Sequence, residues 1–361
     1  MCCQRRHHRG HVRCHRPSAR GGARGRPQGA GRGRRSAPGA GGDLRPGRVT
    51  EQPRVCVVGS LHYDIMVRAR YLPRTGETLM GDAWWWKPGG KGGNQAMAAA
   101  RHGAGVEMIG CLGRDEFGAR LRERLTGAGV GLAHVRTVEE GSGMSVAIVQ
   151  GDGDYAAVVV SGANRDIDEA QIARTGDAIG SSRVLLLQNE IADGANAAAA
   201  RLARAAGITV ILNAAPARAP EGLAGLVDLL VVNAVEAEML GGGRIDGLES
   251  AAVAARELLT LAATVIVTAG AAGVAAAGIA AASDAETLTV PAHPVSRAET
   301  HGAGDVFVGA LAARLADAIP LPDALRYANG AAALHVGTPE ADRDALGPAD
   351  VRRLLSGVAA K

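Results

Sequence analysis

The sequence contains very few aromatic residues. Three Trp, four Tyr and two Phe make up 2% of its 361 residues, whereas hydrophobic residues as a whole make up 47%. A chain of this length buries a sizeable core, and here Ala, Val, Leu and Ile must build that core against 51 glycines. The scarcity of aromatic rings leaves few stacking platforms for the bases of single-stranded nucleic acid.

Cysteines and long hydrophobic runs are also scarce. Three of the five cysteines, Cys2, Cys3 and Cys14, lie close to the N-terminus, and Cys56 and Cys111 lie alone within apolar runs. This number is too small for a disulfide framework and fits a reducing compartment. No apolar run reaches about 18 residues without a charge or a glycine, and the N-terminus lacks an apolar signal core. We therefore expect a soluble cytoplasmic protein without a membrane segment.

Acidic residues are almost absent from residues 1–48. This segment has 13 Arg, no Lys and only Asp43 as an acid, so its net charge is +12. The whole chain carries +4, which leaves −8 for residues 49–361 and gives no argument for a polyanionic partner. The Gly, Pro and Arg content of residues 1–48 predicts a disordered tail. The alternative is that this segment is an upstream extension from a misassigned start, with Val49 as the true start.

After Pro53, short β-branched runs alternate with Ala-rich segments of helical pattern. This alternation predicts one α/β domain over residues 49–361, with helices on both faces of a mostly parallel sheet. The expected strands are Val55–Gly59, Val106–Leu112, Ser145–Gln150, Ala156–Ser161, Val184–Gln188, Thr209–Asn213, Leu229–Asn233 and Val265–Thr268. The expected helices are Gly93–His102, Phe117–Gly127, Gly194–Ala206, Leu248–Leu261, Ala303–Leu315, Leu321–Val336 and Pro348–Leu355.

Residues 61–88 and 141–162 interrupt this alternation. In the second stretch, two β patterns flank the turn Gly151–Asp154, which predicts a hairpin. Together the two stretches are expected to form a small β layer beside the main sheet, in the place of a lid. Side chains alternate along a strand, so Trp84 and Trp86 should share one side. This favours packing in the lid or at a dimer interface over stacking on a substrate.

The first dense glycine cluster, Gly89-Gly90-Lys91-Gly92-Gly93-Asn94, opens a predicted helix. Glycines before a helix allow a ligand to approach N–H groups at the positive end of the helix dipole. The cluster is not a Walker A loop. That pattern needs Gly five residues before Gly90 and Ser or Thr after the Lys, whereas residue 85 is Trp and Gly92 follows Lys91. It is not a dinucleotide fingerprint, because Gln95 occupies the last glycine position. A tight turn with close helix packing is the alternative interpretation.

The second cluster, residues 300–305 (THGAGD), precedes an almost wholly apolar helix. Such a helix is buried, so its N-terminal N–H groups need an anionic partner. Asp305 in the first turn fits simple pairing with the helix dipole. It also fits phosphoryl transfer to a hydroxyl, which needs donors for the phosphoryl charge and a carboxylate for the proton. Further polar residues follow predicted strands, where open α/β sheets bind ligands: Asp64, Glu190, Asn213, Asn233, Glu236 and Thr268.

These residues resemble the PfkB/ribokinase family of carbohydrate kinases. Residues 89–96 (GGKGGNQA) resemble the family's first signature, and residues 300–310 (THGAGDVFVGA), about 210 positions later, resemble the second. The likeness extends over roughly residues 54–355. It implies a Rossmann-like, ribokinase-like domain whose β lid also forms a homodimer. It further implies ATP-dependent phosphorylation of a sugar hydroxyl, with Mg²⁺ as a cofactor.

The resemblance also implies roles for individual residues. Asp305 would be the general base, and the backbone of Gly302, Ala303 and Gly304 would form an anion hole. The residues implied to contact the sugar are His62, Asp64, Gly90, Lys91, Asn94 and Glu190. Those implied to contact ATP are Asn233, Thr268, Gly270, Gly273 and Asn329. Glu236 would hold Mg²⁺ through water, and Glu299 would belong to a K⁺ site if K⁺ activates the protein.

The family resemblance favours D-ribose as the acceptor and D-ribose 5-phosphate as the product. His62 stands where family members that act on ribose usually have Asn, so another pentose, a ketohexose or a nucleoside stays open as the acceptor. Two hypotheses from other classes are a sugar-binding protein without catalysis and an RNA-associated protein that acts through residues 1–48. The intact run 302–305 argues against the first, because a binding protein has no need of a base beside an anion hole.

Overall fold

A computed structural model describes residues 55–357, apart from 151–154, 220–221, 279–286 and 296–299. All of these residues belong to one compact unit, Thr50–Lys361. The predicted tail 1–48, the predicted turn at 151–154 and Glu299 therefore lie outside the described residues.

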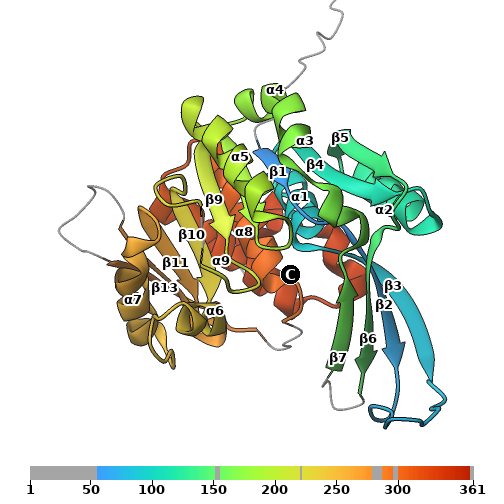
Figure 1. Ribbon diagram of the computed structural model, residues 1–361. Helices are drawn as coiled ribbons and strands as arrows, with labels where there is room; N and C mark the ends of the chain where they lie inside the picture. Colours follow the sequence, from blue (N-terminus) through green and yellow to red (C-terminus); the bar gives the residue numbers. More distant parts are fainter. Residues whose placement is uncertain (1–54, 151–154, 220–221, 279–286, 296–299, 358–361) are drawn as a thin grey trace, which may run out of the picture. The chain divides into compact units, whose positions relative to one another are not determined.

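Among the described residues, nine strands form the central sheet in the order β13-β12-β11-β10-β9-β8-β1-β4-β5 (Figure 1). The strands from β11 to β5 in this order pair in parallel, and β12 and β13 pair antiparallel at one edge. The prediction of a mostly parallel sheet is thus confirmed. The strands are β1 (Val55–Val58), β4 (Val106–Gly113), β5 (Val130–Val138), β8 (Val184–Gln188), β9 (Thr209–Asn213), β10 (Leu229–Asn233), β11 (Thr264–Thr268), β12 (Gly273–Ala277) and β13 (Thr287–Pro291).

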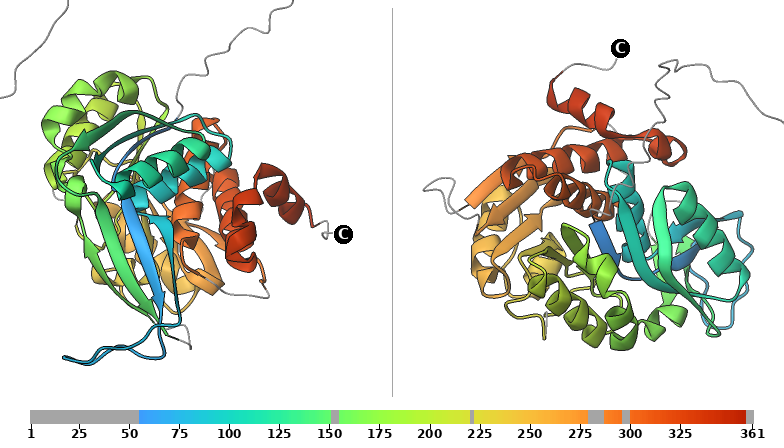
Figure 2. Two further views of the ribbon diagram at one scale, coloured as in Figure 1. Left: turned by 90° about the vertical axis from the view of Figure 1, so that its right-hand side faces the viewer. Right: turned by 90° about the horizontal axis from the view of Figure 1, so that it is seen from above.

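Helices cover both faces of this sheet. Along β1, Val55 and Val57 belong to one buried core and Cys56 and Val58 to the other, because successive side chains point to opposite faces. In Figure 2, the orange and red helices α8 and α9 lie on one side of the sheet and the green helix α5 on the other. The first core contains residues of α1 (Lys91–Arg101), α2 (Glu116–Gly127), α8 (Ala303–Ala316), α9 (Leu321–Gly337) and α10 (Pro348–Leu355); the second contains residues of α3 (Glu169–Arg174), α4 (Gly176–Gly180), α5 (Asp193–Ala205), α6 (Ala234–Met239) and α7 (Leu248–Glu257).

A second, smaller sheet extends from the side of this layer (Figure 1). Its described strands are β2 (His62–Arg68), β3 (Ala83–Gly89), β6 (Gly143–Val149) and β7 (Tyr155–Val160), in the order β3-β2-β6-β7. The pair β2 and β6 is parallel, and the other neighbours are antiparallel. The predicted small β layer is therefore present, and β6 and β7 pair as the two arms of the predicted hairpin.

Three of the few aromatic residues attach the small sheet to α2. The Tyr63 ring lies 4.6 Å from the Trp86 ring and 4.3 Å from the Phe117 ring, measured between centroids, and both pairs are stacked. Trp84 lies two residues from Trp86 on the same strand and is 68% exposed. Trp86 thus takes part in local packing, while Trp84 presents an apolar ring at the surface.

Several elements differ from the sequence prediction. Strands β5, β12 and β13 were not expected, and α1 begins at Lys91, two residues before the predicted start. The sequence of β12 is GVAAA, and alanine has little strand propensity. Its pairing with β11 on one side and β13 on the other fixes it as a buried strand. Tertiary context therefore overrides the local preference at this edge.

Candidate active site

The two glycine clusters meet where α1 and α8 begin. A Cβ atom placed on Gly309 of α8 would lie 2.6 Å from both the Cβ of Ala98 and the carbonyl oxygen of Gln95 on α1. The two helix backbones can approach this closely only because residue 309 has no side chain. The approach brings Asn94 and Asp305, 211 positions apart in the chain, into hydrogen-bond contact.

Asp305 is held by two amide groups of α1. Asn94 Nδ2 donates to one carboxylate oxygen at 3.2 Å, and Gln95 Nε2 donates to the other at 3.0 Å. Burial raises the pKa of Asp305, and the negative charge of Glu190 raises it further, while Lys91 and the two amide donors lower it. The side chain therefore has the oriented carboxylate and the raised pKa that suit a general base.

A cavity of about 160 Å³ lies beside this carboxylate. Asn233 and Thr268, the last residues of β10 and β11, lie on its wall at the carboxyl ends of the parallel strands. Open α/β sheets bind their ligands at this edge. Eight of the residues singled out from the sequence meet here: Lys91, Asn213, Asn233, Glu236, Thr268, Gly302, Gly304 and Asp305.

The first turn of α8 forms another part of the cavity wall. Gly302 is the N-cap with φ of +80°, a left-handed conformation that glycine adopts without strain. The N–H groups that follow have no acceptor within the helix, so the positive end of the dipole faces the cavity. Gly302 and Gly304 line the cavity, whereas the N–H of Ala303 donates to the Thr300 carbonyl at 3.2 Å. The predicted burial of the helix is confirmed, because Val306 to Ala313 are all buried.

Asn233 and Glu236 form a capping box at the start of α6. Asn233 Oδ1 accepts from the Glu236 N–H at 2.8 Å, and Glu236 Oε2 accepts from the Asn233 N–H at 2.9 Å. Burial raises the pKa of Glu236, as does the charge of Asp305, while the Asn233 N–H and Lys91 lower it. Asn233 and Glu236 therefore stabilise the start of α6. From the sequence alone, this capping role and a role in ligand binding were both open.

The donor set around the cavity fits Mg²⁺ bound together with substrate phosphates. Within the described ranges, no three His, Cys, Asp or Glu side chains are grouped so that they would hold a metal ion by themselves. Mg²⁺ commonly keeps several waters and binds through one or two carboxylates and phosphate oxygens. The Glu236 carboxylate lies on the cavity wall and would be such a ligand, directly or through water.

Two further carboxylates lie near the start of α1. Glu190 Oε2 accepts from the Lys91 N–H at 2.8 Å and from the Ser60 hydroxyl. Asp64 on β2 accepts from the Ser145 hydroxyl at 2.6 Å, and its carboxylate lies against Gly89. Both residues are thus placed beside the first glycine cluster.

His62 is the first residue of β2 and is 5% exposed. Its ring lies against Gly143 of β6, and its Nε2 atom has no hydrogen-bond partner in the part of the chain that the structure describes. A buried imidazole nitrogen without a partner is costly unless a ligand or water supplies one.

Three residues predicted to contact ATP lie away from the 160 Å³ cavity. Gly270 lies in a short turn after β11, and Gly273 is the first residue of β12. Asn329 of α9 is buried, and its amide donates to the Pro291 carbonyl at the end of β13 at 2.8 Å. Their contact with a nucleotide stays a prediction, whereas Thr268 of the same predicted group lies on the cavity wall.

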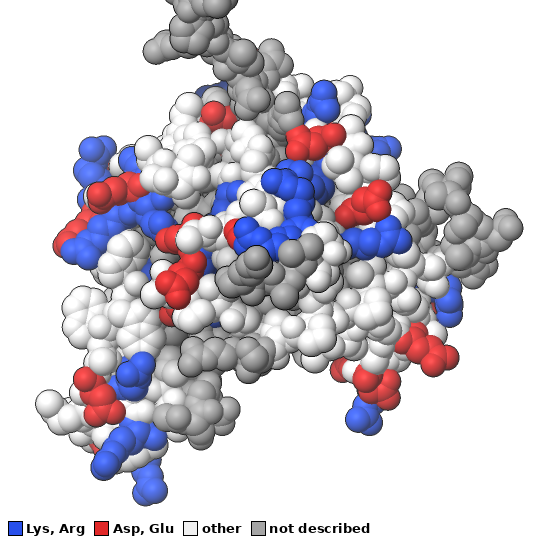
Figure 3. Space-filling model, turned by 180° about the vertical axis from the view of Figure 1, so that it is seen from behind, with Lys and Arg blue, Asp and Glu red and all other residues white. Residues whose placement is uncertain are grey.

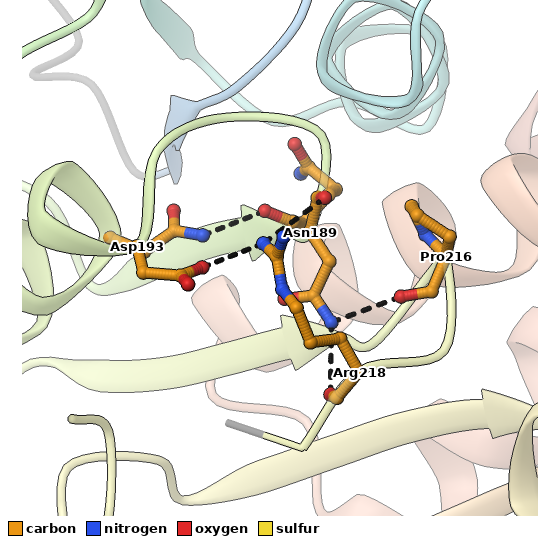
Figure 4. A network of polar contacts seen from close by, with 6 residues as sticks. Asn189, Asp193, Pro216 and Arg218 are labelled. Atoms are coloured by element: carbon orange, nitrogen blue, oxygen red, sulfur yellow. Dashed lines mark hydrogen bonds and ion pairs between the residues drawn. The ribbon is translucent and has the colours of Figure 1, made fainter. Parts of the chain in front are cut away.

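A polar network holds the segment around Glu190, from Asn189 to Asp193 (Figure 4). Asn189 Nδ2 donates to the carbonyls of Pro216 at 3.1 Å and Arg218 at 3.2 Å. The Arg218 guanidinium in turn pairs with Asp193 at 2.6 Å. These contacts join the residues after β8 to the loop after β9. Glu190 therefore lies in a segment that is held in place on both sides.

The residues that hold the carboxylates in place were not expected from the sequence. Gln95, Ser60 and Ser145 donate to Asp305, Glu190 and Asp64, respectively. Gln95 offered one signal, because it is a polar residue within a run of small apolar residues on a predicted helix. Its partners lie 118 and 210 positions away, so local pattern did not identify them.

These features define a class of protein. A Rossmann-like α/β domain places an oriented carboxylate and a glycine-rich helix N-terminus beside one cavity at the ends of parallel strands. That arrangement is the one required for phosphoryl transfer to a hydroxyl group.

Comparison with known proteins agrees with this class. The model of the pfkB family of carbohydrate kinases matches residues 52–346. The chain is 33% identical over 283 residues to a ribokinase of Haemophilus influenzae, covering 78% of this chain and 91% of that one. It is 34% identical over 284 residues to a ribokinase of Bacillus subtilis, covering 78% and 92%. The structure of Arabidopsis thaliana ribokinase with ribose and ATP superposes with a TM-score of 0.76 at 30% identity, covering 84% and 98%.

The chain therefore belongs to the pfkB family of carbohydrate kinases. The expected ribokinase-like fold with a small β lid is confirmed, as is its assignment as an ATP-dependent sugar kinase. None of the helices in the described part of the chain combines the length and hydropathy needed to cross a membrane.

Proposed function

We propose that the protein transfers the γ-phosphoryl group of ATP to the primary hydroxyl of D-ribose, forming D-ribose 5-phosphate and ADP. The observation that carries this proposal is the Asp305 carboxylate, held by Asn94 and Gln95 at the N-terminus of α8 and facing the cavity. Similarity to ribokinases along most of the chain supports ribose as the acceptor.

In this mechanism, Asp305 accepts the proton of the acceptor hydroxyl as the hydroxyl oxygen attacks the γ-phosphorus. The new O–P bond forms, the bond from the γ-phosphorus to the β–γ bridging oxygen breaks, and ADP leaves with that electron pair. The N–H groups at the start of α8, with Lys91 beside them, stabilise the negative charge on the transferring group. When bound, Mg²⁺ neutralises charge on the phosphates, and Glu236 would hold it.

The remaining site residues fall into two groups under this proposal. The sugar would lie between the small sheet and α1, in contact with His62, Asp64, Gly90, Lys91, Asn94 and Glu190. The nucleotide would extend along the carboxyl ends of the strands toward Asn233, Thr268, Gly270, Gly273 and Asn329. Activation by K⁺ near Glu299, and a cytoplasmic location, stay predictions from the sequence.

We also propose that the protein is a homodimer that pairs through the small sheet. Trp84 on β3 and Val158 on β7 are 68% and 70% exposed, and the strand register places both on one face of the small sheet. Large apolar side chains gathered on one small element are typical of a protein interface. Pairing with the small sheet of a second copy would hold the lid in place over the sugar site.

The test is ADP release by the full chain with ATP and Mg²⁺, with and without K⁺, against ribose, deoxyribose, fructose, other pentoses and nucleosides. We expect ribose to give the highest kcat/KM. Preference for another acceptor would keep the mechanism and reassign the sugar, with His62→Asn as the variant that tests the cause. Lack of turnover across the panel would contradict the kinase proposal.

Asp305→Asn tests the assigned base. We expect kcat to fall by roughly 10²–10⁴, because a general base supplies about that factor, while ATP binding changes little. Turnover of this variant close to that of the parent would contradict the role of Asp305.

A further inference from the structure

A chain of buried amide groups lies directly behind Asp305. Gln95 is 0% exposed, and its Nε2 atom donates to Asp305 Oδ1 at 3.0 Å and to Asn213 Oδ1 at 2.9 Å. Its Oε1 atom accepts from Gln188 Nε2 at 2.8 Å. All three partners lie on elements other than α1, namely α8, β9 and β8.

These contacts allow only one orientation of the Gln95 amide. A flipped amide would turn its oxygen toward two acceptors, Asp305 and Asn213, and its NH₂ toward the donor of Gln188. Two partners impose this orientation: the ionised Asp305 carboxylate offers only acceptors, and the Asn213 amide is fixed because its Nδ2 donates to the Val231 carbonyl at 3.0 Å. The backbone carbonyl of Gln188 in turn accepts from Asn196 Nδ2 at 2.8 Å. Gln95 is therefore a donor whose direction is set by the sheet.

We propose that Gln95 is a positioning residue for the catalytic carboxylate: it binds one oxygen of Asp305 and turns the other toward the acceptor hydroxyl. The proposal rests on the proposed kinase function of the same site. Asn94 would share the second oxygen with the acceptor, so removing Gln95 would leave one hydrogen bond from α1, the longer of the two, to orient the carboxylate. The amide chain thereby links the base to β8, β9, β10 and α5.

Gln95 also affects the proton affinity of the base. A hydrogen bond donated to an ionised carboxylate stabilises the charged form, which opposes the effect of burial on the pKa of Asp305. The charged and titratable groups that face Asp305 are Lys91 on α1, Glu190 after β8, Glu236 on α6 and His301 before α8. The side-chain partners of Gln95 are Asp305, Asn213 and Gln188 and include none of these four, so we expect a change in the Asp305 pKa of a Gln95 variant to report the lost amide.

The experiment compares the pH dependence of kcat/KM for the parent, Gln95→Met and Gln188→Met with the preferred acceptor. Methionine retains the length of glutamine without its donors. In Gln95→Met we expect kcat/KM to fall by about 10- to 100-fold through misplacement of the base. The acidic limb should move to higher pH by about one unit as the hydrogen bond is lost. ATP binding should be unchanged.

Gln188→Met is the matched control. It removes a buried amide of the same chain but leaves the bond between Gln95 and Asp305 intact. We expect a similar loss of thermal stability with the acidic limb unmoved. Equal limbs in the parent and Gln95→Met, or equal shifts in both variants, would overturn the proposal.

If Gln95→Met does not fold, Gln95→Glu provides the same test with a near-isosteric side chain. A second carboxyl group against Asp305 should raise the apparent pKa of the pair and move the acidic limb to higher pH. An unmoved limb would again overturn the proposal. An inactive parent would instead contradict the kinase function, so the two failures are distinguishable.

Discussion

At the scale of single residues, the site contains three carboxylates that are held by different hydrogen-bond donors. Asp305 is oriented by two amides and has a raised pKa, so we expect kcat/KM to fall as the pH decreases through that pKa. Glu190 and Asp64 accept from serine hydroxyls, and Glu190 also accepts from a helix N–H. Each carboxylate thus has a defined direction before any ligand binds.

Glu236→Gln tests the proposed Mg²⁺ ligand. The glutamine retains an oxygen that can accept from the Asn233 N–H, so the capping box and the stability of α6 should be largely kept. Removal of the charge should shift the Mg²⁺ dependence of turnover to higher concentration. An unchanged Mg²⁺ titration at equal thermal stability would count against this role.

His102 should make stability depend on pH. Burial and the charges of Arg101 and Arg314 lower its pKa to about 4, and its Nδ1 atom lies 3.0 Å from the Tyr327 hydroxyl. In the unfolded chain the pKa is near 6.5, so the unfolded state binds the proton first as the pH decreases. The free energy of unfolding should therefore fall between pH 6.5 and about 4, by roughly 1 kcal/mol for each pH unit.

Chemical denaturation of the parent and of His102→Gln across this range checks the expectation. The variant lacks the titrating group, so its free energy of unfolding should depend less steeply on pH. Parallel curves for the two proteins would show that His102 does not carry this dependence.

At the scale of elements, the contact between α1 and α8 positions the site. Gly309→Ala would place a methyl group 2.6 Å from Ala98 and from the Gln95 carbonyl oxygen. We expect the two helices to separate, with a loss of about 1–3 kcal/mol in the free energy of unfolding from overpacking. Turnover should fall as well, because Asn94 and Gln95 would move relative to Asp305.

Gly330→Ala is the matched control on α9. A methyl group there would meet Leu355 at 3.4 Å and Val351 at 3.5 Å, which is ordinary contact. Alanine is also a better helix former than glycine, so we expect unchanged or slightly higher stability and normal turnover. Equal effects of the two substitutions, measured by denaturation and by ADP release, would refute the close-approach argument.

At the scale of the whole molecule, the proposed dimer interface is a property of the small sheet. Val158→Lys would place a charge on the exposed face of β7, where Val158 is 70% exposed. We expect this variant to sediment as a monomer with a higher KM for the sugar, since the lid would lose its partner. Val253→Lys, at a half-exposed position on α7, should leave the oligomeric state unchanged. A monomeric parent would contradict the proposal.

Basic and acidic side chains are interspersed on the face of the molecule seen in Figure 3. Elsewhere in the chain, Asp344 pairs with both Arg101 and Arg124, at 2.6 and 2.5 Å. Opposite charges at this distance weaken each other's field.

The sequence by itself determined the alternation of strands and helices, the small β layer and the two glycine clusters. It also singled out Asp305, Gly302 and Gly304 as candidate site residues, because they lie within four consecutive positions, and the structure places all three on one cavity wall. Strong local periodicity predicts an element wherever the element's own pattern decides its structure. Helix α8 is such a case: it begins at the predicted Ala303 and is buried on all sides.

Only the tertiary structure decided how these parts are joined. The strand character of the alanine-rich β12 comes from its two neighbours, and the orientation of Asp305 comes from Gln95 and Asn94, more than 200 positions away. The same holds for Glu190, which binds the N–H of Lys91 and the hydroxyl of Ser60. Hydrogen bonds between distant residues depend on how closely helices and strands pack, and a pattern read along the chain contains no measure of that distance.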